Sequence, residues 1–395
     1  MTDYPQLVLK EGRERSLVGG HPWLFSGAVA KIKGRPEPGE IVLATTTEGQ
    51  PLALGFYNTQ SDIAFRMLTR DVAVTVDQEF WQRQFRNAAA LRNRILASDT
   101  TALRLVNAEG DGMPGLVVDR YGDYLVMVIS TMGMERRRDT VIEALVGEYR
   151  SLGILERSDG PARRMEGLTD RTGWVWGEEA PERISIRENG LAFEVDIRTG
   201  QKTGFFLDQR DNRRQIGSLS NGLSVLNCFS YTGAFSVYAA RGGAKRVVSV
   251  DSSEPANEAA RHHLEMNGFP AEAHPVLRGD VFQYLRKTEE SFDLIILDPP
   301  AFAKSRREVQ HAARGYKDIN LQAFRRLATG GMLATFSCSN AIDEALFEKI
   351  VLGAARDAGK TLRLLKKLAA APDHPTSLAH SEGRYLKGLL VSALP

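Results

Sequence analysis

The stretch from Asn227 to Asp251 constrains the fold of this chain more than any other part of the sequence. The apolar run 223–226 is typical of a buried parallel strand, and the residues at 231–234 predict a tight turn after it. A helix is expected next, and Asp251 follows the next apolar strand, 18 positions beyond Gly233 (251 minus 233). This order of strand, turn, helix and acidic residue is typical of α/β sheets that bind a nucleoside-containing cofactor.

The glycine content of the turn indicates which cofactor fits it. A dinucleotide fold needs the pattern GxGxxG, because the backbone must approach a pyrophosphate, and this turn offers Gly233 alone. S-adenosylmethionine carries an adenosine and an amino-acid tail but no phosphate, so the turn favours it. A nicotinamide cofactor and an ordinary α/β core are the alternatives that this segment leaves open.

A second buried strand is predicted at 292–297, and it ends in Asp298, Pro299 and Pro300. Functional crevices of open α/β sheets lie at the carboxyl ends of their strands, where Asp298 would stand. The two prolines keep the chain extended and offer carbonyl groups and a flat surface to an aromatic base. The alternative is a strand followed by a stiff loop.

A third strand is expected at 331–339, with Cys338 near its end. Methylation at C5 of cytosine or uracil needs a thiolate that adds to C6, because C5 is otherwise a poor nucleophile. Methylation of an exocyclic amine needs no thiol. The alternative is structural, since free cysteine often packs as a small apolar residue.

At this point the chain resembles the class I adenosylmethionine-dependent RNA cytosine-C5 methyltransferases that modify large-subunit ribosomal RNA. The resemblance extends over nearly the whole length. It is carried by HPWLFSGAV (21–29), NAEGDGMPGLVVDRYGD (107–123), GQKTGFFLDQRDNR (200–213), NCFSYTGAF (227–235), DPPAF (298–302), RGYKDIN (314–320) and FSCS (336–339).

The resemblance implies an α/β fold with three parts. Residues 1–72 would form a β-rich PUA domain that grips structured RNA, in agreement with the short strands and turns expected between residues 6 and 68. Residues 73–189 would form a small α+β middle domain, and 190–395 a Rossmann-like methyltransferase domain. A docking role without RNA contact is the alternative for the first part.

The resemblance also implies a mechanism that produces 5-methylcytosine. Cys338 would add to C6 of a flipped-out cytosine, and Asp298 would hydrogen-bond or protonate the ring at N3 and the exocyclic amine. Many RNA cytosine-C5 enzymes carry a second cysteine after the proline pair, whereas Ala301 stands here, so one cysteine would serve the whole cycle. An amine methyltransferase acting on RNA and a non-catalytic ribosome assembly factor are the two alternatives.

Three sets of candidate site residues follow. The catalytic candidates are Cys338 and Asp298. The cofactor-binding candidates are Lys202, Phe205, Phe206, Asn227, Phe229, Tyr231, Thr232, Gly233, Ala234, Asp251, Ser252, Asp280, Val281 and Asp298. The substrate-binding candidates are Pro299, Pro300, Phe302, Lys304 and Arg210. Within 201–210, a cover over the bound cofactor is expected, and a domain-crossing strand is the alternative.

The charge of the chain is nearly balanced, at +2, which argues against a polycation that coats nucleic acid. Local basic clusters are expected to be solvated faces rather than phosphate sites. They are Lys31, Lys33 and Arg35; Arg83, Arg86, Arg92 and Arg94; and Arg136 to Arg138. The group Lys304, Arg306 and Arg307 is the exception, because it follows Asp298 and a polyanionic substrate must cross that mouth.

Two cysteines among 395 residues are too few for a disulfide framework, and no leader sequence is recognised near Tyr4 and Pro5. We therefore expect a cytoplasmic protein with no membrane span and no metal, whose partner is large-subunit ribosomal RNA or a pre-ribosomal particle. A homodimer is also considered.

Five further elements are expected along the chain. The range 77–96 has apolar residues on one helical side, and 115–119 and 124–129 read as paired strands. The apolar runs 362–368 and 385–393 would form the antiparallel pair that closes a methyltransferase sheet. His374, between them, is expected to be structural or a substrate contact rather than a base.

Overall fold

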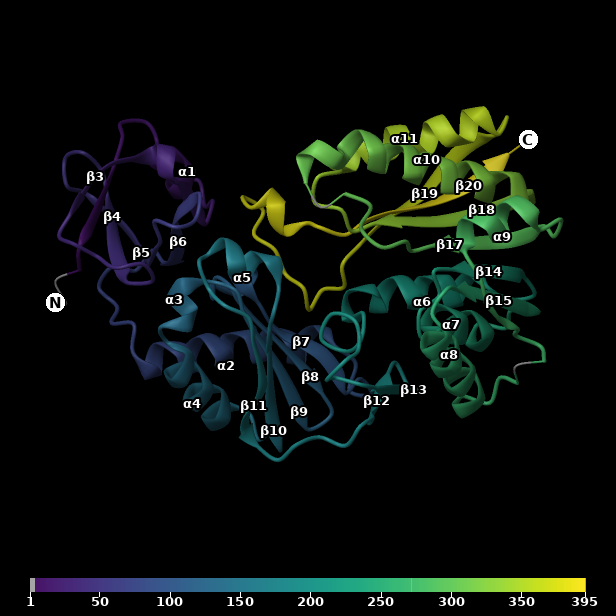
Figure 1. Ribbon diagram of the computed structural model, residues 1–395, viewed down its shortest axis with the longest axis horizontal. Coiled ribbons are helices and arrows are strands. Elements are labelled where there is room, and N and C mark those ends of the chain that lie inside the picture. The colour runs from purple at the N-terminus through teal and green to yellow at the C-terminus, as the bar shows by residue number, and fades with distance from the viewer. Residues whose placement is uncertain (1–3, 271, 304, 395) are drawn as a thin grey trace. The chain divides into compact units, whose positions relative to one another are not determined.

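The structure, a computed structural model, describes residues 4–270, 272–303 and 305–394, which form two compact units (Figure 1). Unit 1 comprises Met1–Gly190, Val195–Leu207 and Pro372–Gly383. Unit 2 comprises Leu191–Glu194, Asp208–Ala371 and Arg384–Pro395. Within the described ranges, no helix has both the length and the apolar character that crossing a membrane requires.

Unit 1 begins with a six-stranded sheet in the order β2-β6-β5-β4-β1-β3. Its elements are β1 (Gln6–Leu9), α1 (Glu14–Val18), β2 (Trp23–Phe25), the 3-10 helix η1 (Ser26–Ala28), β3 (Val29–Lys33), β4 (Ile41–Thr45), β5 (Pro51–Tyr57) and β6 (Ile63–Thr69). The core of this sheet includes Leu7, Val42 and Phe65. Gly55 lets β5 approach β6, because a Cβ there would lie 2.4 Å from the carbonyl oxygen of Arg66. The strand-rich module expected between residues 6 and 68 is confirmed.

A second sheet of unit 1 has five strands in the order β11-β10-β9-β8-β7. Its elements are α2 (Gln78–Ile95), β7 (Ala102–Asn107), η2 (Ala108–Asp111), β8 (Leu116–Tyr121), β9 (Tyr124–Ile129), α3 (Met132–Glu135), α4 (Arg138–Glu148), β10 (Gly153–Ser158), α5 (Pro161–Met165) and β11 (Arg171–Gly177). The carboxylate of Asp77 accepts the backbone N–H of Phe80 and so caps α2. The predicted helix and the predicted β8–β9 hairpin are both confirmed.

Ion pairs occupy the interior of this second sheet. Arg92, which we expected on a solvated helix face, is 1% exposed. Its Nη1 lies 2.6 Å from Asp111 Oδ1 and its Nη2 lies 2.8 Å from Asp111 Oδ2. Helical periodicity alone places Arg92 on the polar side, and the prediction was wrong because the paired carboxylate lets the guanidinium be buried. Arg104 pairs in the same way with the buried Asp119.

Two later segments of the chain complete unit 1. In Val195–Leu207, the Oγ1 of Thr203 lies 2.9 Å from the phenol oxygen of Tyr121. In Pro372–Gly383, the carbonyl of Asp373 accepts a 2.7 Å hydrogen bond from Arg92, and its carboxylate accepts the backbone N–H of Arg104 at 3.0 Å. The last residues of the chain that belong to unit 1 are therefore anchored to α2 and β7.

Unit 2 is built on a seven-stranded sheet in the order β16-β15-β14-β17-β18-β20-β19. Its strands are β14 (Ser224–Cys228), β15 (Arg246–Asp251), β16 (Val276–Arg278), β17 (Phe292–Leu297), β18 (Leu327–Ser337), β19 (Thr361–Ala369) and β20 (Lys387–Leu394). Its helices are α6 (Arg210–Leu219), α7 (Ala234–Arg241), α8 (Glu254–Met266), α9 (Val281–Lys287), α10 (Val309–Arg326) and α11 (Glu344–Asp357). The remaining short elements of the chain fall in both units: β12 (Ile184–Glu188) and η5 (Ser381–Gly383) lie in unit 1, η4 (Arg306–Glu308) lies in unit 2, and β13 (Leu191–Val195) and η3 (Leu207–Gln209) lie where the chain passes between the units.

The first five strands of this sheet run parallel, and β20 pairs antiparallel with both β18 and β19. Helices α10 and α11 pack together on one face, and α6, α7 and α8 lie on the other (Figure 1). The chain crosses from β16 back to β17 beside β14, so the strand order reverses between β14 and β17. Ligands of open α/β sheets bind at such a reversal.

Most of the elements predicted for unit 2 are confirmed, with two corrections. The antiparallel pair expected at the C-terminal end is β19 and β20. The strand that we expected to start at Gly331 starts at Leu327 and ends one residue before Cys338. The alternative of a domain-crossing strand at 201–210 is wrong, because Lys202 has φ of 53° and Gly204 has φ of 134°, which interrupt an extended chain.

Candidate active site

The register of the sheet brings three sequence-predicted strand ends to one edge. Cys228 of β14 stands opposite Leu297 of β17, and Leu297 stands opposite Thr335 of β18. Asp298 therefore begins the loop next to the turn that follows β14. The carboxyl ends of β14, β17 and β18 therefore lie along one edge of the sheet, where ligands of open α/β sheets bind.

The turn after β14 has an unusual backbone. Phe229 and Tyr231 have φ of 57° and 46°, and Gly233 has φ of 76°. Gly233 is required there, because a Cβ would lie 2.7 Å from the Cβ of Ala260 in α8. Left-handed conformations at residues other than glycine cost free energy and concentrate at binding sites. The helix α7 starts directly after this turn, at Ala234, and Thr232 is half-buried within it.

Asp251, at the end of β15, is tied to this turn. One carboxylate oxygen accepts the backbone N–H of Tyr231 and the other accepts that of Ser253, both at 2.9 Å. Two backbone N–H groups thus orient the carboxylate, and its remaining lone pairs are still able to accept further hydrogen bonds. Its half-buried position suits contact with ribose hydroxyls, whereas its neighbour Ser252 is exposed.

Asp280 and Val281 follow β16, at the far side of the same edge. The carboxylate of Asp280 accepts the backbone N–H of Gln283 at 2.8 Å and so caps α9. Val281 is 3% exposed and belongs to the core of the unit. Asp280 thus has a structural role as the cap of α9, and its predicted contact with the cofactor remains a prediction.

Two buried polar atoms near the β14 turn test whether a nucleoside cofactor fits. The amide nitrogen of Asn227 donates to the hydroxyl of Ser236 at 2.9 Å. Asn227 Oδ1 and Ser230 Oγ are buried and have no hydrogen-bond partner within the described part of the chain. Proteins rarely leave such atoms unmatched. A ligand with hydroxyl and amine groups and no phosphate suits these oxygens, because such groups can donate to them.

The loop after β17 holds Asp298 and the two prolines. Asp298 is half-buried, and its Oδ2 accepts a 3.0 Å hydrogen bond from Nε2 of Gln209, a residue that is 1% exposed. Sequence reasoning missed Gln209, although it lies within the motif at 200–213. Pro299 is buried and Pro300 is exposed.

Phe302 and Lys304 follow the prolines. The Phe302 ring lies 4.6 Å from the ring of Tyr316 and 6.0 Å from that of Phe282, so it packs against the unit itself. The contact of Phe302 with the substrate remains a prediction. Lys304 lies outside the described residues, and Arg307, from the same basic group, is exposed.

Cys338 begins the loop after β18 and is half-buried. Its Sγ lies 4.0 Å from the carbonyl oxygen of Pro299, so the thiol and the Asp298–Pro299 loop are neighbours. The next residue, Ser339, is held by three groups: the Tyr316 hydroxyl at 2.9 Å, the Ala303 N–H at 3.2 Å and Nζ of Lys387 at 2.8 Å. Lys387 was also not among the residues predicted from the sequence.

The residues predicted from the motif at 200–213 fall in both units. Lys202, Phe205 and Phe206 belong to unit 1, where the Nζ of Lys202 lies 4.6 Å from the Phe206 ring centroid. Phe205 is buried, and its N–H donates to Tyr121. Arg210 begins α6 of unit 2 and is 2% exposed, 3.5 Å from Asp211. Because Arg210 is buried, its predicted contact with the substrate remains a prediction.

Three further observations bear on the chemistry. Cys228 is fully buried, and burial raises the pKa of its thiol well above the ordinary value. His374 is also buried and its Nδ1 lies 3.0 Å from Asp373 in unit 1, in agreement with the structural role expected for it. In the ranges that the structure describes, no group of histidine, cysteine and acidic residues could hold a metal ion.

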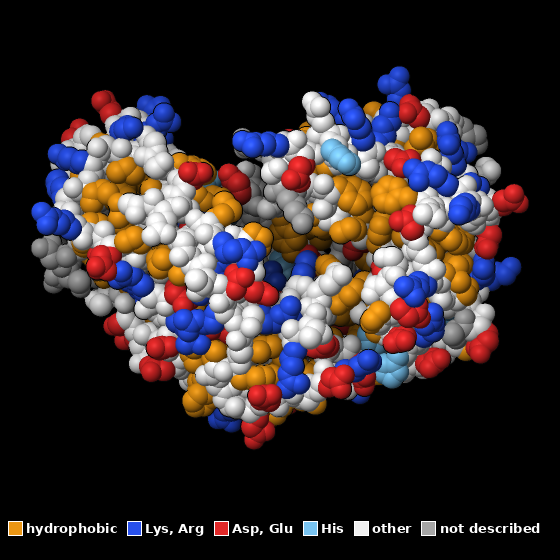
Figure 2. Space-filling view, in the orientation of Figure 1, with side chains coloured by type: hydrophobic (Ala, Val, Ile, Leu, Met, Phe, Trp, Pro, Cys, Tyr) orange, Lys and Arg blue, Asp and Glu red, His pale blue; other side chains and the backbone are white. Residues whose placement is uncertain are grey.

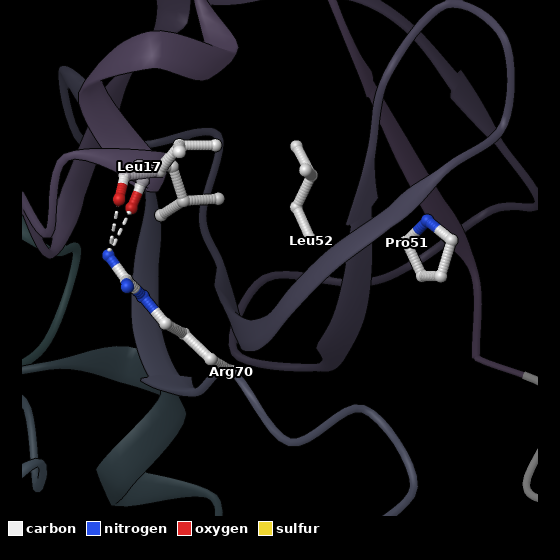
Figure 3. A pocket seen from close by; sticks show the side chains of 5 residues that line it. Leu17, Pro51, Leu52 and Arg70 are labelled. Carbon is white, nitrogen blue, oxygen red and sulfur yellow. Dashed lines mark hydrogen bonds between the residues drawn. The ribbon is translucent and has the colours of Figure 1, made fainter.

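Figure 2 shows basic side chains interspersed with acidic ones over the visible face, in agreement with the low net charge. A small pocket of about 200 Å³ lies in the first sheet of unit 1, lined by Leu17, Val18, Pro51, Leu52 and Arg70 (Figure 3). The guanidinium of Arg70 donates to the carbonyls of Leu17 and Val18 at 2.8 and 2.9 Å. The pocket therefore offers apolar surface and no reactive group.

Comparison with known proteins places the geometry in context. Residues 167–391 match the family model of S-adenosylmethionine-dependent methyltransferases, and residues 7–70 match a PUA-like domain. A protein from Aeromonas hydrophila named ribosomal RNA large subunit methyltransferase I is 46% identical over 98% of this chain and 99% of its own length. Its namesake from Aeromonas salmonicida is 45% identical, with the same coverage.

A solved structure in complex with SAH has a TM-score of 0.85 and 26% identity, and covers 98% of this chain and 99% of that one. The chain is an enzyme whose cofactor is S-adenosylmethionine, and it belongs to the S-adenosylmethionine-dependent methyltransferase family, in which it combines the catalytic domain with a PUA-like domain.

Proposed function

We propose that this enzyme forms 5-methylcytosine in large-subunit ribosomal RNA, with Cys338 as the nucleophile. The observation that carries the proposal is the position of the Cys338 thiol, 4.0 Å from the carbonyl of Pro299 in the loop that begins with Asp298. A thiol and a carboxylate at neighbouring strand ends match what methylation of a pyrimidine ring carbon requires. Both Aeromonas relatives are named as ribosomal RNA large subunit methyltransferases, which supports the substrate class.

The cofactor would be held by the turn after β14 and by the ends of β15 and β16. Asp251 would accept hydrogen bonds from the ribose hydroxyls, and the left-handed backbone at Phe229 and Tyr231 would admit the cofactor close to the main chain. Asn227 and Ser230 would find partners for their unmatched oxygens. When bound, S-adenosylmethionine supplies an electrophilic methyl group. Lys202 is assigned to the cofactor carboxylate by resemblance alone.

In the first chemical step, the thiolate of Cys338 forms a bond to C6 of the cytosine, and the electron pair of the C5–C6 double bond makes C5 nucleophilic. After C5 has taken the methyl group, C5 loses its proton to a base, the bond from sulfur to C6 breaks, and the double bond returns. The target base must leave its stack, because C5 and C6 are otherwise out of reach. Because Ala301 stands after the prolines, where many RNA cytosine-C5 enzymes have a second cysteine, Cys338 alone would serve both attack and product release.

Asp298 would bind the face of the cytosine that carries N3 and the exocyclic amine. Its Oδ2 accepts a hydrogen bond from Gln209, a geometry that supports an ionised carboxylate able to accept from the amine. A protonated Asp298 would instead donate to N3. The contact with N3 would draw electrons from C6, and the contact with the amine would favour cytosine, which has an amine where uracil has a carbonyl.

Of the alternatives, amine methylation rests on the DPPAF sequence, whose aromatic residue would have to stack on the target base. Phe302 is already packed against Tyr316 and Phe282, which argues against that use. A non-catalytic assembly factor does not agree with membership of the enzyme family.

The same proposal includes the RNA partner and the cellular location of the enzyme. The PUA-like domain would bind structured RNA, within naked ribosomal RNA or a pre-ribosomal particle, and the substrate places the enzyme in the cytoplasm. A homodimer is a separate prediction, which light scattering on the purified protein would test.

Nucleoside mass spectrometry tests the proposed function directly. Large-subunit RNA from cells without the protein is incubated with the enzyme and methyl-labelled S-adenosylmethionine, then digested to nucleosides. The label is expected in 5-methylcytidine, and it should disappear with Cys338→Ala but persist with Cys228→Ala. Label on an amine, or full turnover by Cys338→Ala, would show that the proposal is wrong.

A further inference from the structure

Lys387 is an unusual lysine, because it is only 9% exposed. It begins β20, where it pairs with Ser337 of β18 on one side and with Ala369 of β19 on the other. Lysine is seldom buried to this degree, since its ammonium group loses the stabilisation that water provides. A buried lysine beside a site therefore needs a reason.

The ammonium group of Lys387 is directed at the segment that carries the Cys338 thiol. Its Nζ donates a 2.8 Å hydrogen bond to the carbonyl of Ser339, the residue that follows Cys338. On the other side, the hydroxyl of Ser339 contacts the Tyr316 hydroxyl and the Ala303 N–H. Ser339 is thus held at its backbone carbonyl from β20, and at its side chain from α10 and the loop after β17.

The electrostatic setting agrees with this geometry. Burial lowers the pKa of Lys387, and the negative charges of Cys338 and Asp343 act in the opposite direction. Tyr316 faces the same segment, and burial raises the pKa of its phenol, with the Cys338 charge adding to that effect. The positive charge of Lys387 interacts with the charge of Cys338 and would favour a thiolate there.

We propose that Lys387 is a positioning residue for Cys338, which fixes the Ser339 carbonyl and stabilises the negative charge of the thiolate. The inference rests on the proposed role of Cys338 as nucleophile. A thiolate, not a thiol, adds to C6, and a nearby cation increases the fraction of thiolate at neutral pH. Lys387 would not touch the cytosine or transfer a proton, and its effect would pass through the sulfur.

The test measures the reactivity of the Cys338 thiol as a function of pH. The full-length protein carries Cys228→Ala, so that Cys338 is its single cysteine, and mass spectrometry follows alkylation by iodoacetamide between about pH 5.5 and 10. Three substitutions separate the contributions. Lys387→Arg keeps the charge and the donor, Lys387→Gln keeps a donor without the charge, and Lys387→Met keeps neither.

We expect Lys387→Gln and Lys387→Met to move the reactivity profile to higher pH, with alkylation at pH 7 about tenfold slower for each unit that the thiol pKa rises. The rate at high pH, where the thiol is fully ionised, should change little, and Lys387→Arg should restore the original profile. The acid side of the pH dependence of kcat/KM should move in the same direction. A merely structural lysine would change none of these midpoints.

An unchanged profile in folded Lys387→Gln would overturn the inference, with folding confirmed by thermal unfolding and by calorimetric binding of S-adenosylmethionine. Lys387→Gln keeps the hydrogen bond, so it retains the test if Lys387→Met fails to fold. The proposed function fails on a different result, methylation by Cys338→Ala. If Cys338 is essential and Lys387→Gln leaves the thiol unaltered, only the role of Lys387 is wrong.

Discussion

The two cysteines of this enzyme stand at the carboxyl ends of two strands of one sheet, β14 and β18, with β17 between them. Their surroundings nevertheless differ. Cys228 is the last residue of β14, fully buried between Val250 of β15 and Leu297 of β17. Cys338 is the first residue after β18 and is half-buried, with a carbonyl at 4.0 Å and a lysine bound to the next residue.

A shift of one residue relative to the strand end thus separates two kinds of thiol. Inside the strand, Cys228 is surrounded by apolar side chains, and burial raises its pKa, so it stays protonated. Beyond the strand, Cys338 is half-buried, and its side chain lies near the backbone carbonyl of Pro299. The comparison teaches that the strand boundary, rather than the residue type, decides whether a cysteine of this sheet is available for chemistry.

The strongest way to break this comparison is to trap the covalent adduct. RNA that contains 5-fluorocytosine cannot lose a proton from C5, so the enzyme should stay bonded to it through sulfur after methyl transfer. We expect a complex that survives denaturing electrophoresis with the parent enzyme and with Cys228→Ala. With Cys338→Ala the complex should vanish, a loss of about a thousandfold or more, as for other covalent nucleophiles.

Cys228→Ala is the matched control, since it removes the same group at the other strand end. A stable complex formed by Cys338→Ala, or a complex lost in Cys228→Ala with folding intact, would reverse the assignment of the two thiols.

A second prediction concerns the thiols themselves. In the folded enzyme at about pH 7.5, iodoacetamide should modify Cys338, while Cys228 should react about a hundredfold or more slowly, because it is reached only when the structure opens. Peptide mapping by mass spectrometry after timed quenching measures both rates. In urea the two rates should converge, and comparable rates in the native protein would contradict the contrast.

A third prediction sharpens what the β14 end does contribute, which is backbone conformation. Gly233→Ala puts a Cβ 2.7 Å from that of Ala260 at a φ of 76°, so we expect a loss of about 2 kcal/mol in the free energy of unfolding and weaker cofactor binding. Gly222→Ala is the control, because Gly222 has φ of 73° and no atom lies within 4 Å of the place that its new methyl group would take.

Urea unfolding and calorimetry with S-adenosylmethionine measure the two effects. The control should lose about 1 kcal/mol of stability, from backbone strain alone, and bind the cofactor as the parent does. Equal cofactor affinity in both variants would mean that the turn tolerates displacement.

The smallest expected effect is on the pH dependence of stability. The folded pKa of Cys228 is raised above its ordinary value of 9.0, so the folded state keeps a proton that the unfolded state loses. The free energy of unfolding should therefore fall as pH rises above about 9, with a contribution of at most about 1.4 kcal/mol per pH unit from this thiol. Cys228→Ala should show a shallower fall between about pH 8.5 and 10.5 in urea unfolding, and identical slopes would count against the burial argument.

Sequence reasoning found the site residues that stand directly after apolar runs. Asp251, Asp298 and Cys338 could be placed because a parallel sheet brings its strand ends to one edge, and β14, β15, β17 and β18 are short apolar segments. The small-residue turn predicted Gly233 in the same way. These positions depend on local pattern, which a sequence displays.

Gln209 and Lys387 were missed because their roles depend on pairing between distant segments. Gln209 is 89 positions from Asp298, and only the folded unit brings its amide to the carboxylate. Lys387 reads in sequence as a polar residue at the start of an apolar run, and the antiparallel register with β18 places it by Ser337. Arg92 was misplaced for a similar reason, since its partners Asp111 and Asp373 lie outside its helix.

The segment Pro372–Gly383 has a consequence for the order in which the protein forms. While the chain is synthesised, Arg92 meets Asp111 after 19 positions, but the carbonyl of Asp373 comes 281 positions later, when most of unit 2 has already been made. Unit 1 is thus the first unit whose translation begins, but its folding cannot be completed until Pro372–Gly383 has been translated. In a nascent chain that stalls before residue 372, the Arg92 guanidinium and the backbone N–H of Arg104 would each lack the acceptor that Asp373 provides inside unit 1. Unit 1 can therefore be completed only after the ribosome has translated the catalytic sequence.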